Sequence, residues 1–362
     1  MKEIICLSNE PWSKNPGRTQ QLITRIRDTH ILYFSPPSSS RDFSWKKPGR
    51  KVKPNVIAFT LPPAFLSNTP IPFFQIHTQK KWGRFITQQA RKHHIRNPLL
   101  WTSSPKHLHL LEEVSHHSLV YDCDRKWSGM PEEWEQNLAQ EADVVFTLSP
   151  NLRERLSPYS PNIAIIPNGV NFPLFSGQDI QPHPNVVSLP SPVLGWLGTI
   201  SPDLDLSPLL YAAHTRPEWT FLLIGEKSSD NPYLDKLLRH RNVISIPPCA
   251  LMELPEYLAK CNVLLNFLHT DRPYDDVIPR RIYEYLSTGK PVVSMLWPDQ
   301  VETFPDVIYG ANTPEEFIHL CSRALEENPN WLSQRRRDHG ASASWSNRAD
   351  EITAILIVSG LL

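Results

Sequence analysis

The sequence predicts an α/β protein built from two doubly wound, Rossmann-like domains. Short apolar runs alternate with helical segments in both halves of the 362-residue chain, and this alternation is typical of parallel sheets covered on both faces. The length also exceeds what one hydrophobic core usually serves. A polar, proline-dotted stretch without helical period, from about Pro173 to Pro192, is expected to link the two domains.

The first half begins with a buried strand and continues with strands separated by helices or polar loops. We expect strands over Glu3–Ser8, His30–Phe34, Asn55–Leu61, Leu99–Ser103, Leu119–Asp122, Val144–Leu148 and Ile163–Ile166, and helices over Thr19–Asp28 and Pro131–Gln140. The segment between Ser38 and Asn55 is rich in Pro, Ser and Lys and is interpreted as a loop.

The second half repeats the pattern more clearly. Strands are expected over Pro192–Leu197, Trp219–Ile224, Val243–Ile246, Val263–Phe267 and Val292–Leu296, and helices over Leu206–His214, Tyr233–Arg241, Leu254–Lys260, Arg281–Ser287 and Pro314–Glu327. In such sheets ligands bind beyond the carboxyl ends of the strands, so the loops after these strands are the place to look for a site.

Charge and cysteine content exclude several classes of protein. Lys+Arg and Asp+Glu both count 37, which argues against a general nucleic-acid binder. The five cysteines are scattered and form no CxxC, so a reducing compartment is expected. No secretory signal and no apolar run of the roughly 18 residues that a spanning helix needs are recognised. We therefore expect a cytoplasmic protein.

The most informative stretch is a short helix that follows Pro279. Free N–H groups at a helix start attract anions, and the guanidinium groups of Arg280 and Arg281 suit phosphate oxygens. Glu284 lies one turn further on, where a carboxylate can accept from two ribose hydroxyls. This pattern predicts a cradle for a nucleotide diphosphate, and the alternative is an ordinary surface Arg–Glu pair.

The run from Pro279 to Val293 resembles the donor-site signature of GT-B glycosyltransferases of the retaining family 4, or group 1, type. It is most similar to the teichuronic-acid biosynthesis subgroup. Asp276 stands where the family has a first glutamate, and Arg281 stands where the subgroup usually has lysine. Further matches are Gly195–Ile200, Phe221–Gly225, Leu254–Val263, Ala142–Ser149, Ile166–Val170 and the opening Leu7–Trp12 with Gly17-Arg18.

The resemblance implies a GT-B fold with two domains facing across a cleft. Residues 1–175 would hold the acceptor, residues 190–340 would hold the nucleotide sugar, and residues 341–362 would form a helix crossing back to the first domain. It implies transfer from a nucleotide-diphosphate sugar to a saccharide or lipid-linked acceptor in cell-wall or exopolysaccharide biosynthesis, with retention of configuration. No cofactor, no metal and no nucleic-acid partner are expected.

The resemblance also assigns residues. The donor site is expected at Gly198, Thr199, Gly225, Asp276, Arg280, Arg281, Tyr283 and Glu284, and acceptor contacts are expected at Trp12, Gly17 and Arg18. Arg281 would also stabilise the leaving diphosphate. A histidine of the wider family is missing after the strand that ends near Asp122, so Asp122 or Asp124 is expected to replace it at the reaction centre.

Asp122-Cys123-Asp124 leaves other interpretations open. A DxD motif can hold a divalent metal on a diphosphate, or its carboxylates can simply cap a loop. Four histidines, His107, His109, His116 and His117, lack the spacing of a metal site and are interpreted as surface residues of a helix.

Two basic segments stand out in the first half. One contains Trp45 with Arg41, Lys46, Lys47, Arg50, Lys51 and Lys53, and the other contains Trp82 with Lys80, Lys81, Arg84, Arg91, Lys92, His93, His94 and Arg96. Such segments suit an anionic acceptor or peripheral contact with the inner face of an anionic membrane; a solvated basic face is the alternative. Two other functions also stay open: a sugar-nucleotide epimerase on the same fold, and a non-catalytic binding module.

Overall fold

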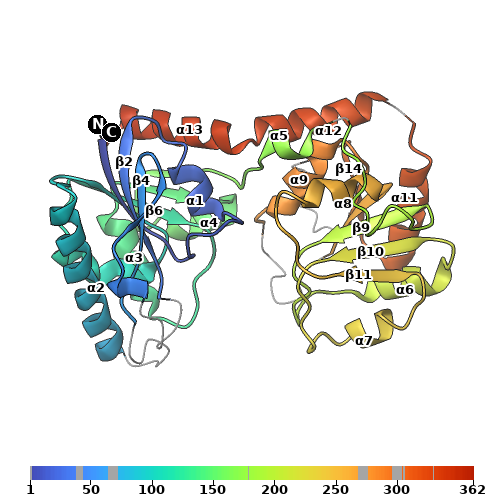
Figure 1. Cartoon of the computed structure of the whole chain (residues 1–362), viewed down its shortest axis with the longest axis horizontal. Helices are drawn as coiled ribbons and strands as arrows, with labels where there is room; N and C mark the ends of the chain where they lie inside the picture. The colour runs from blue at the N-terminus through green and yellow to red at the C-terminus, as the bar shows by residue number, and fades with distance from the viewer. Residues whose placement is uncertain are drawn as a thin grey trace. The chain divides into compact units, whose positions relative to one another are not determined.

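The computed structural model describes residues 2–37, 44–63, 72–177, 179–267, 276–295, 304, 306–328 and 330–362. The chain divides into two compact units (Figure 1). The first unit comprises Met1–Pro167 together with Trp345–Leu362, and the second comprises Asn168–Ser344.

The first unit is built on an eight-stranded sheet in the order β3-β4-β2-β1-β5-β6-β7-β8. Its strands are β1 (Lys2–Leu7), β2 (Thr29–Ser35), β3 (Arg50–Lys53), β4 (Val56–Thr60), β5 (Leu99–Thr102), β6 (Ser118–Cys123), β7 (Val144–Thr147) and β8 (Ile163–Ile165). All neighbouring strands are parallel except β3, which pairs antiparallel with β4.

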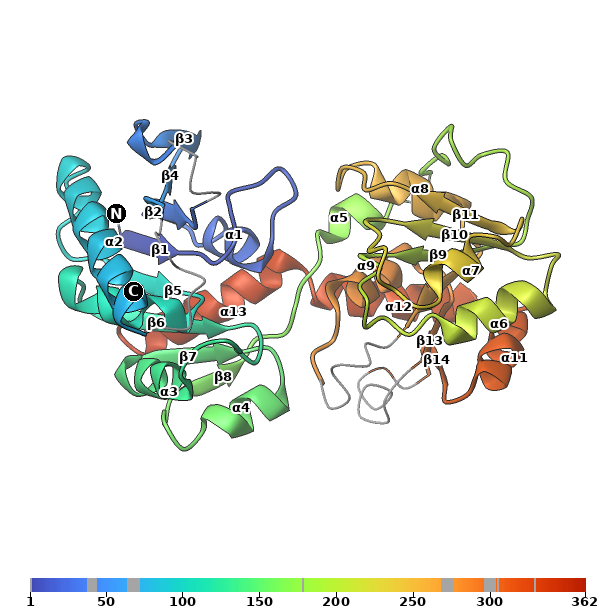
Figure 2. The same cartoon turned by 90° about the horizontal axis from the view of Figure 1, so that it is seen from below.

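Helices cover both faces of this sheet (Figure 2). They are α1 (Arg18–Ile23), the 3₁₀ helices η1 (Ser44–Lys46) and η2 (Pro105–Glu113), α2 (Pro72–Lys92), α3 (Glu132–Glu141), α4 (Pro150–Leu156) and α13 (Trp345–Val358). α1 packs against α13 on one face, and α2 packs against η2 on the other. The α13 side chains Ile352 and Leu356 share a core cluster with Ile4 and Cys6 of β1, so the last helix completes the first unit.

The second unit is built on a six-stranded parallel sheet in the order β11-β10-β9-β12-β13-β14. Its strands are β9 (Val193–Leu197), β10 (Thr220–Ile224), β11 (Val243–Ile246), β12 (Val263–Asn266), β13 (Val292–Met295) and β14 (Ile308–Ala311); its helices are α5 (Phe172–Phe175), α6 (Ser207–Thr215), α7 (Leu234–Leu237), α8 (Leu254–Lys260), α9 (Arg280–Thr288), α11 (Pro314–Leu325) and α12 (Asn330–Ser342). Separate apolar clusters fill its two faces.

The main difference from the sequence prediction lies between residues 50 and 92. Arg50–Lys53, expected as loop, is the antiparallel edge strand β3, and charged side chains are common on edge strands. The second basic segment lies on the 21-residue helix α2, whose inner face buries Trp82, Ile86 and Ala90. The helix was missed because these few apolar residues, spaced four apart, form only a weak helical pattern within a sequence rich in cations. Arg41 lies outside the described residues.

The stretch expected to link the domains packs onto the second unit instead. Phe175 and Val186 are fully buried in its core, and Phe172, Leu174 and Leu189 pack around them. These apolar residues have no regular spacing, which explains why the stretch resembled a linker. Among the described helices, none is both long and apolar enough to cross a membrane.

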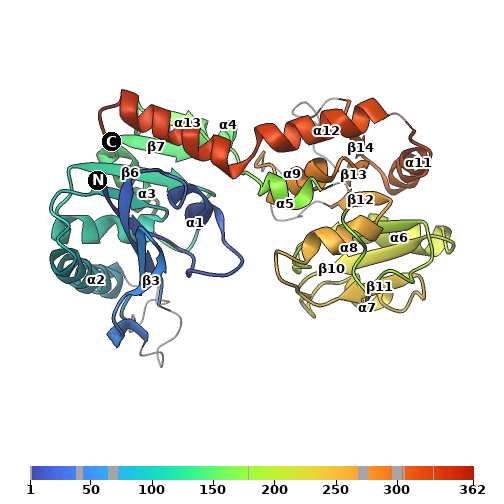
Figure 3. The ribbon, with the colours of Figure 1, turned by 45° about the horizontal axis from the view of Figure 1, so that its top comes forward.

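Helix α12 closes the second unit by packing along α9 (Figure 3). Its Arg336 is 1% exposed and donates from Nη1 and Nη2 to the two carboxylate oxygens of Glu327, each at 2.6 Å. The Nε of Arg336 donates to the Val307 carbonyl at 2.8 Å, and the Tyr309 hydroxyl donates to Glu327. This network fastens α12 to β14.

We expect Arg336→Met to lower the free energy of unfolding of the second unit by about 3–5 kcal/mol, because Glu327 would keep a largely buried charge without its partner. Urea unfolding followed by circular dichroism measures the change. Arg335→Met is the matched control: Arg335 is half exposed and 3.8 Å from Asp306, so its loss should cost less than about 1 kcal/mol. Equal effects of the two changes would contradict the role given to Arg336.

Candidate functional site

In the second unit, the chain changes direction along the sheet at β9. It runs from β9 outward to β10 and β11, and then returns to β12, β13 and β14 on the other side. Ligands of open parallel sheets bind at such a switch point, beyond the carboxyl ends of the strands. The candidate site therefore lies where β9 and β12 end.

A glycine turn follows β9. Gly198 has a φ of 152° and Gly225, after β10, has a φ of 142°, both in the region that favours glycine. A Cβ on Gly225 would lie 1.8 Å from the Gly198 carbonyl oxygen. The two N–H groups expected to approach a diphosphate are used by the sheet, donating to Ile224 and Ile246. Within the described ranges, the N–H of the exposed Thr199 has no acceptor, so it is the free donor of this turn.

Arg281 occupies the switch point. Its Nε donates to the side-chain oxygen of Asn266 at the end of β12, at 2.7 Å, and its guanidinium lies 5.5 Å from the Trp196 ring centre. Asn266 in turn donates to the Ser294 hydroxyl at 2.8 Å. Nη1 of Arg281 lies 2.9 Å from where a Cβ on Gly198 would be, so only glycine leaves this space free.

Arg281 has no carboxylate at ion-pair distance among the described residues. Burial lowers the pKa of its guanidinium from its ordinary value, and the charge of Glu284, further along the same helix, opposes that shift. Its only described hydrogen-bond acceptor is the neutral amide of Asn266. A partly buried cation without a direct carboxylate contact at a helix start is suited to binding an anion.

Glu284 and Arg280 form the second part of the site. Glu284 is 4% exposed, and its Oε1 lies 3.1 Å from Nε of Arg280, which is 39% exposed. Burial raises the pKa of the Glu284 carboxyl, and Arg280 and Arg281 oppose that shift. Arg280 thus directly precedes Arg281, and Glu284 lies about one helical turn after it on the same helix.

Two other donor-site expectations have different outcomes. Tyr283 is buried in the core of the second unit, with its ring edge-on to Phe304 at 5.8 Å. Its ring therefore packs α9 against the core, and its role as a donor-binding residue stays a prediction. Asp276 is partly exposed in the loop before α9, and its role as a donor-binding residue stays a prediction.

In the first unit, the structure joins Arg18 and Asp122 in a buried ion pair. Nε and Nη2 of Arg18 donate to the Asp122 carboxylate at 3.0–3.3 Å, and Nη1 donates to the Pro167 carbonyl at 3.0 Å. Burial raises the pKa of Asp122 and Arg18 opposes this. Asp122 is fully buried, and the pair fastens α1 to β6; the catalytic role expected of Asp122 and the acceptor role expected of Arg18 stay predictions.

Asp124, two residues on, keeps partial exposure. Its two carboxylate oxygens accept from Nε and Nη2 of Arg125 at 2.8 Å and 2.6 Å. In the parts of the chain that the structure describes, no group of three His, Cys, Asp or Glu side chains is arranged to hold a metal ion. Asp122 and Asp124 both remain candidates at the reaction centre, and Asp124 is the more exposed of the two.

The other expected acceptor residues shape the loop after β1. The Trp12 ring packs edge-on to Tyr33 at 5.1 Å, and the Trp12 N–H donates to Ser35. A Cβ on Gly17 would lie 1.6 Å from a carboxylate oxygen of Glu10, so a larger residue here would require the Glu10 side chain to move. Trp12 lines a surface cavity together with Lys14 and Arg50, and the acceptor role of Trp12 and Gly17 stays a prediction.

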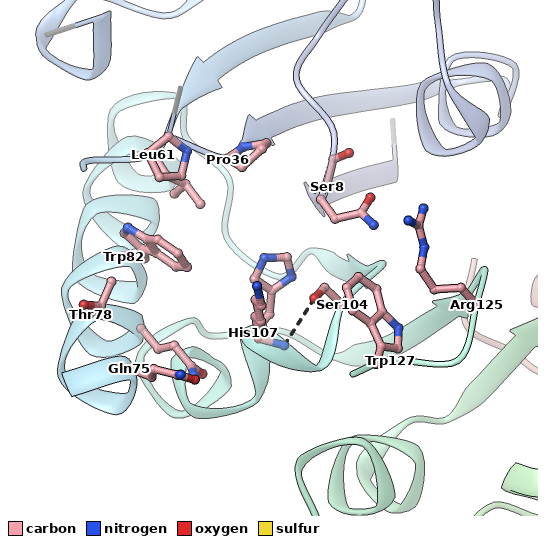
Figure 4. A pocket seen from close by; sticks show the side chains of 14 residues that line it. Ser8, Pro36, Leu61, Gln75, Thr78, Trp82, Ser104, His107, Arg125 and Trp127 are labelled. Carbon is pink, nitrogen blue, oxygen red and sulfur yellow. Dashed lines mark hydrogen bonds between the residues drawn. The ribbon is translucent and has the colours of Figure 1, made fainter. Parts of the chain in front are cut away.

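The first unit holds a cavity of about 350 Å³ at the carboxyl ends of its strands (Figure 4). Loops after β1, β2, β4, β5 and β6 meet the inner face of α2 there. The lining residues are Ser8, Asn9, Pro36, Pro37, Leu61, Gln75, Thr78, Gln79, Trp82, Ser104, Lys106, His107, Arg125 and Trp127. Two of these residues were named above: Trp82 as part of a basic segment, and His107 as one of four histidines without metal-site spacing.

His107 is not a surface residue. It is 4% exposed, its Nδ1 lies 2.8 Å from the Thr102 hydroxyl, and burial lowers its pKa to about 3. It is therefore neutral at any physiological pH. The 3₁₀ helix that carries it begins right after β5, and a histidine so close to a strand end was the one available signal in the sequence.

Comparisons with known proteins agree with this geometry. Residues 207–354 match the family model described as glycosyl transferase-like. TuaH of Bacillus subtilis (strain 168), a candidate teichuronic acid biosynthesis glycosyltransferase, is 27% identical over 273 residues, and the match covers 68% of each chain.

Solved structures extend the likeness to the whole chain. Sucrose-phosphate synthase from Thermosynechococcus elongatus has a TM-score of 0.76 at 15% identity, covering 99% of both chains. Anabaena HepE in complex with UDP has a TM-score of 0.70 at 17% identity, covering 99% of this chain and 100% of that one. These matches agree with the resemblance seen in the sequence: the whole chain has the GT-B fold, and residues 207–354 match a glycosyl transferase-like domain.

Proposed function

We propose that the chain transfers a sugar from a nucleotide-diphosphate sugar to a saccharide acceptor, retaining the anomeric configuration and using no metal ion. The observation that carries the donor assignment is Arg281. Its guanidinium sits at the switch point and at a helix start, without a described carboxylate partner. A diphosphate supplies negative charge and pairs of oxygens that the planar guanidinium can bind in a bidentate way.

Stabilisation of the departing diphosphate is the catalytic step assigned to this site. As the bond to the sugar breaks, negative charge grows on the bridging phosphate oxygen, and preoriented donors lower the barrier. Arg281 is preoriented because Asn266 fixes its Nε and the Trp196 ring lies beside its guanidinium. The Thr199 N–H, open on the same turn as Gly198, is a second donor for the phosphates.

Glu284 is proposed to hold the ribose. Its carboxylate is buried and already accepts from Arg280 at one oxygen, which leaves lone pairs for the two ribose hydroxyls. Burial raises the pKa of this carboxyl, and the neighbouring Arg280 opposes that shift and so favours the ionised form. The ribose and the diphosphate would thus be held by a single helix, α9.

The acceptor and the pathway are proposed from chemistry and likeness. A B. subtilis relative bears a teichuronic-acid description and a similar fold holds UDP, which supports a role in cell-wall or exopolysaccharide assembly with a nucleotide sugar as donor. Of the two carboxylates expected at the reaction centre, Asp124 is the more exposed. Retention of configuration is testable directly by NMR of the anomeric proton in the product.

We expect Arg281→Gln to lower kcat/KM for the nucleotide sugar by about 10²–10³-fold, because one preoriented donor to the leaving group is lost. The rate is measured as nucleoside diphosphate released, either by donor hydrolysis or by transfer to a saccharide acceptor. Arg239→Gln is the control, since Arg239 is exposed on the same unit and far along the chain from α9. Full activity of Arg281→Gln would contradict the proposed leaving-group role.

We expect Glu284→Gln to weaken binding of the preferred nucleoside diphosphate at least about tenfold, because an amide offers one acceptor oxygen in place of two. Calorimetry with UDP and GDP in the presence of EDTA measures the affinity and identifies the base. Glu315→Gln, at an exposed position of α11, is the control. Unchanged affinity in the folded variant would rule out the ribose contact, and loss of binding on adding EDTA would rule out metal independence.

Peripheral membrane contact is proposed at the start of α2. Phe73 and Phe74 are 72% and 39% exposed, and Lys81 follows on the same helix with its side chain exposed. Aromatic rings beside cations are typical of helices that lie on anionic bilayers.

We expect the protein to float with vesicles containing anionic phosphatidylglycerol and to stay unbound with vesicles of neutral phosphatidylcholine, because the cations of α2 need anionic headgroups. Flotation through a sucrose gradient measures the bound fraction. Replacing Phe73 and Phe74 by serine should reduce that fraction several-fold. Equal flotation of this variant, or binding to neutral vesicles, would contradict contact through α2.

A further inference from the structure

The cavity of the first unit lies at that unit's own switch point. The sheet runs from β1 to β2 and β4 on one side and to β5 and β6 on the other, and loops from the ends of all five strands line the space. Its volume of about 350 Å³ is near the lower end for small-molecule pockets. A single sugar ring is a ligand of suitable size.

Two tryptophans give the cavity apolar walls (Figure 4). Trp82 comes from α2 and its indole N–H donates to the Pro62 carbonyl at 2.8 Å. Trp127 comes from the loop after β6, and its indole Nε1 is buried without a hydrogen-bond partner in the described structure. A buried donor left unpaired is costly, and because this N–H is covered, what Trp127 offers a ligand is its flat apolar face.

His107 lies between these two rings in Figure 4 and offers a hydrogen-bond acceptor. We assign the proton of the neutral His107 ring to Nδ1, which then donates to the Thr102 hydroxyl oxygen at 2.8 Å while that hydroxyl donates to the Ser104 carbonyl at 3.3 Å. The neutral ring then has its lone pair on Nε2, for which no described residue is a donor. A sugar hydroxyl can donate to that nitrogen.

The cavity wall is cationic. Lys106 and Arg125 line it, and none of its described lining residues is an acid. Arg125 uses Nε and Nη2 on Asp124, so its Nη1 has no described protein acceptor. Figure 4 shows its guanidinium above Trp127, on the side of the cavity away from Trp82. The wall therefore suits a ligand that carries negative charge at one end.

We propose that this cavity binds one anionic sugar unit, a sugar carrying a carboxylate or phosphate, with His107 receiving a hydroxyl and Arg125 facing the anionic group. That this sugar belongs to the acceptor rests on the proposed function. Binding of the sugar itself does not, because it is assigned from the cavity of the first unit alone.

The test is a titration of protein labelled with ¹⁵N at tryptophan, following the indole N–H resonances. Trp127→Phe assigns the Trp127 signal. Glucuronate, glucose 6-phosphate, glucose and inorganic phosphate are the probes. We expect at least one anionic sugar to shift the Trp127 signal with an affinity about tenfold or more above those of glucose and phosphate, and the tighter of the two identifies the anionic group. No shift with any sugar, or equal affinity for glucose, would overturn the proposal.

Variants separate the two contacts. Arg125→Gln should abolish the preference for anionic sugars while glucose binding stays the same, and His107→Phe should weaken all the sugars. Arg153→Gln, on the exposed face of α4, should change neither. Retained preference in Arg125→Gln would overturn the role of that residue, and unchanged sugar affinity in a folded His107→Phe would overturn that of His107.

UDP and GDP are titrated into the same samples to separate the two proposals. Nucleotide binding without sugar binding overturns the cavity proposal alone, and sugar binding without nucleotide binding contradicts the donor site alone.

Discussion

The donor site depends on one constraint, the placement of the Arg281 guanidinium between the ends of β9 and β12. Asn266 holds its Nε, Ser294 holds Asn266, and the missing Cβ of Gly198 leaves the space that its Nη1 occupies. Each of these contacts comes from a different strand or turn, and only the strand order β10-β9-β12-β13 brings them together. The strand order therefore determines where the charge lies: Arg281 is placed at the point where the order of the strands along the sheet reverses.

The helix that carries Arg281, α9, is positioned by contacts with its neighbouring protein segments. Gly289 ends α9 in the left-handed conformation with a φ of 77°, and Lys290 donates from Nζ to the carbonyls of Ala259 and Cys261 at the end of α8. On its other side α9 meets α12, where a Cβ on Gly340 would lie 2.4 Å from the Ser287 hydroxyl. Much of the signature that resembled a donor motif thus fixes the direction of the helix start.

Features carried by residues that are adjacent in the chain could be predicted from the sequence, and features that depend on distant residues could not. Apolar runs marked the central strands because those strands are buried on both faces, and the helix start after Pro279 revealed its anion chemistry because the residues concerned are adjacent in the chain. The edge strand β3 and helix α2 were missed because their cations hide a weak apolar pattern. The Arg18–Asp122 pair joins residues 104 positions apart, and no local pattern reports such a partner. His107 was read as exposed because its burial depends on α2, which had not been recognised.

The two units use the same strand geometry with opposite electrostatics. At the switch point of the second unit a guanidinium stays without a described carboxylate, so the site keeps affinity for a diphosphate. In the first unit, Arg18 is neutralised by Asp122 deep beneath α1, and Arg125 is only half satisfied by Asp124 at the rim of the cavity. A guanidinium with all its donors used would attract an anion only weakly. Partial pairing gives the first unit a weaker anion site, which suits a sugar that must bind, react and leave.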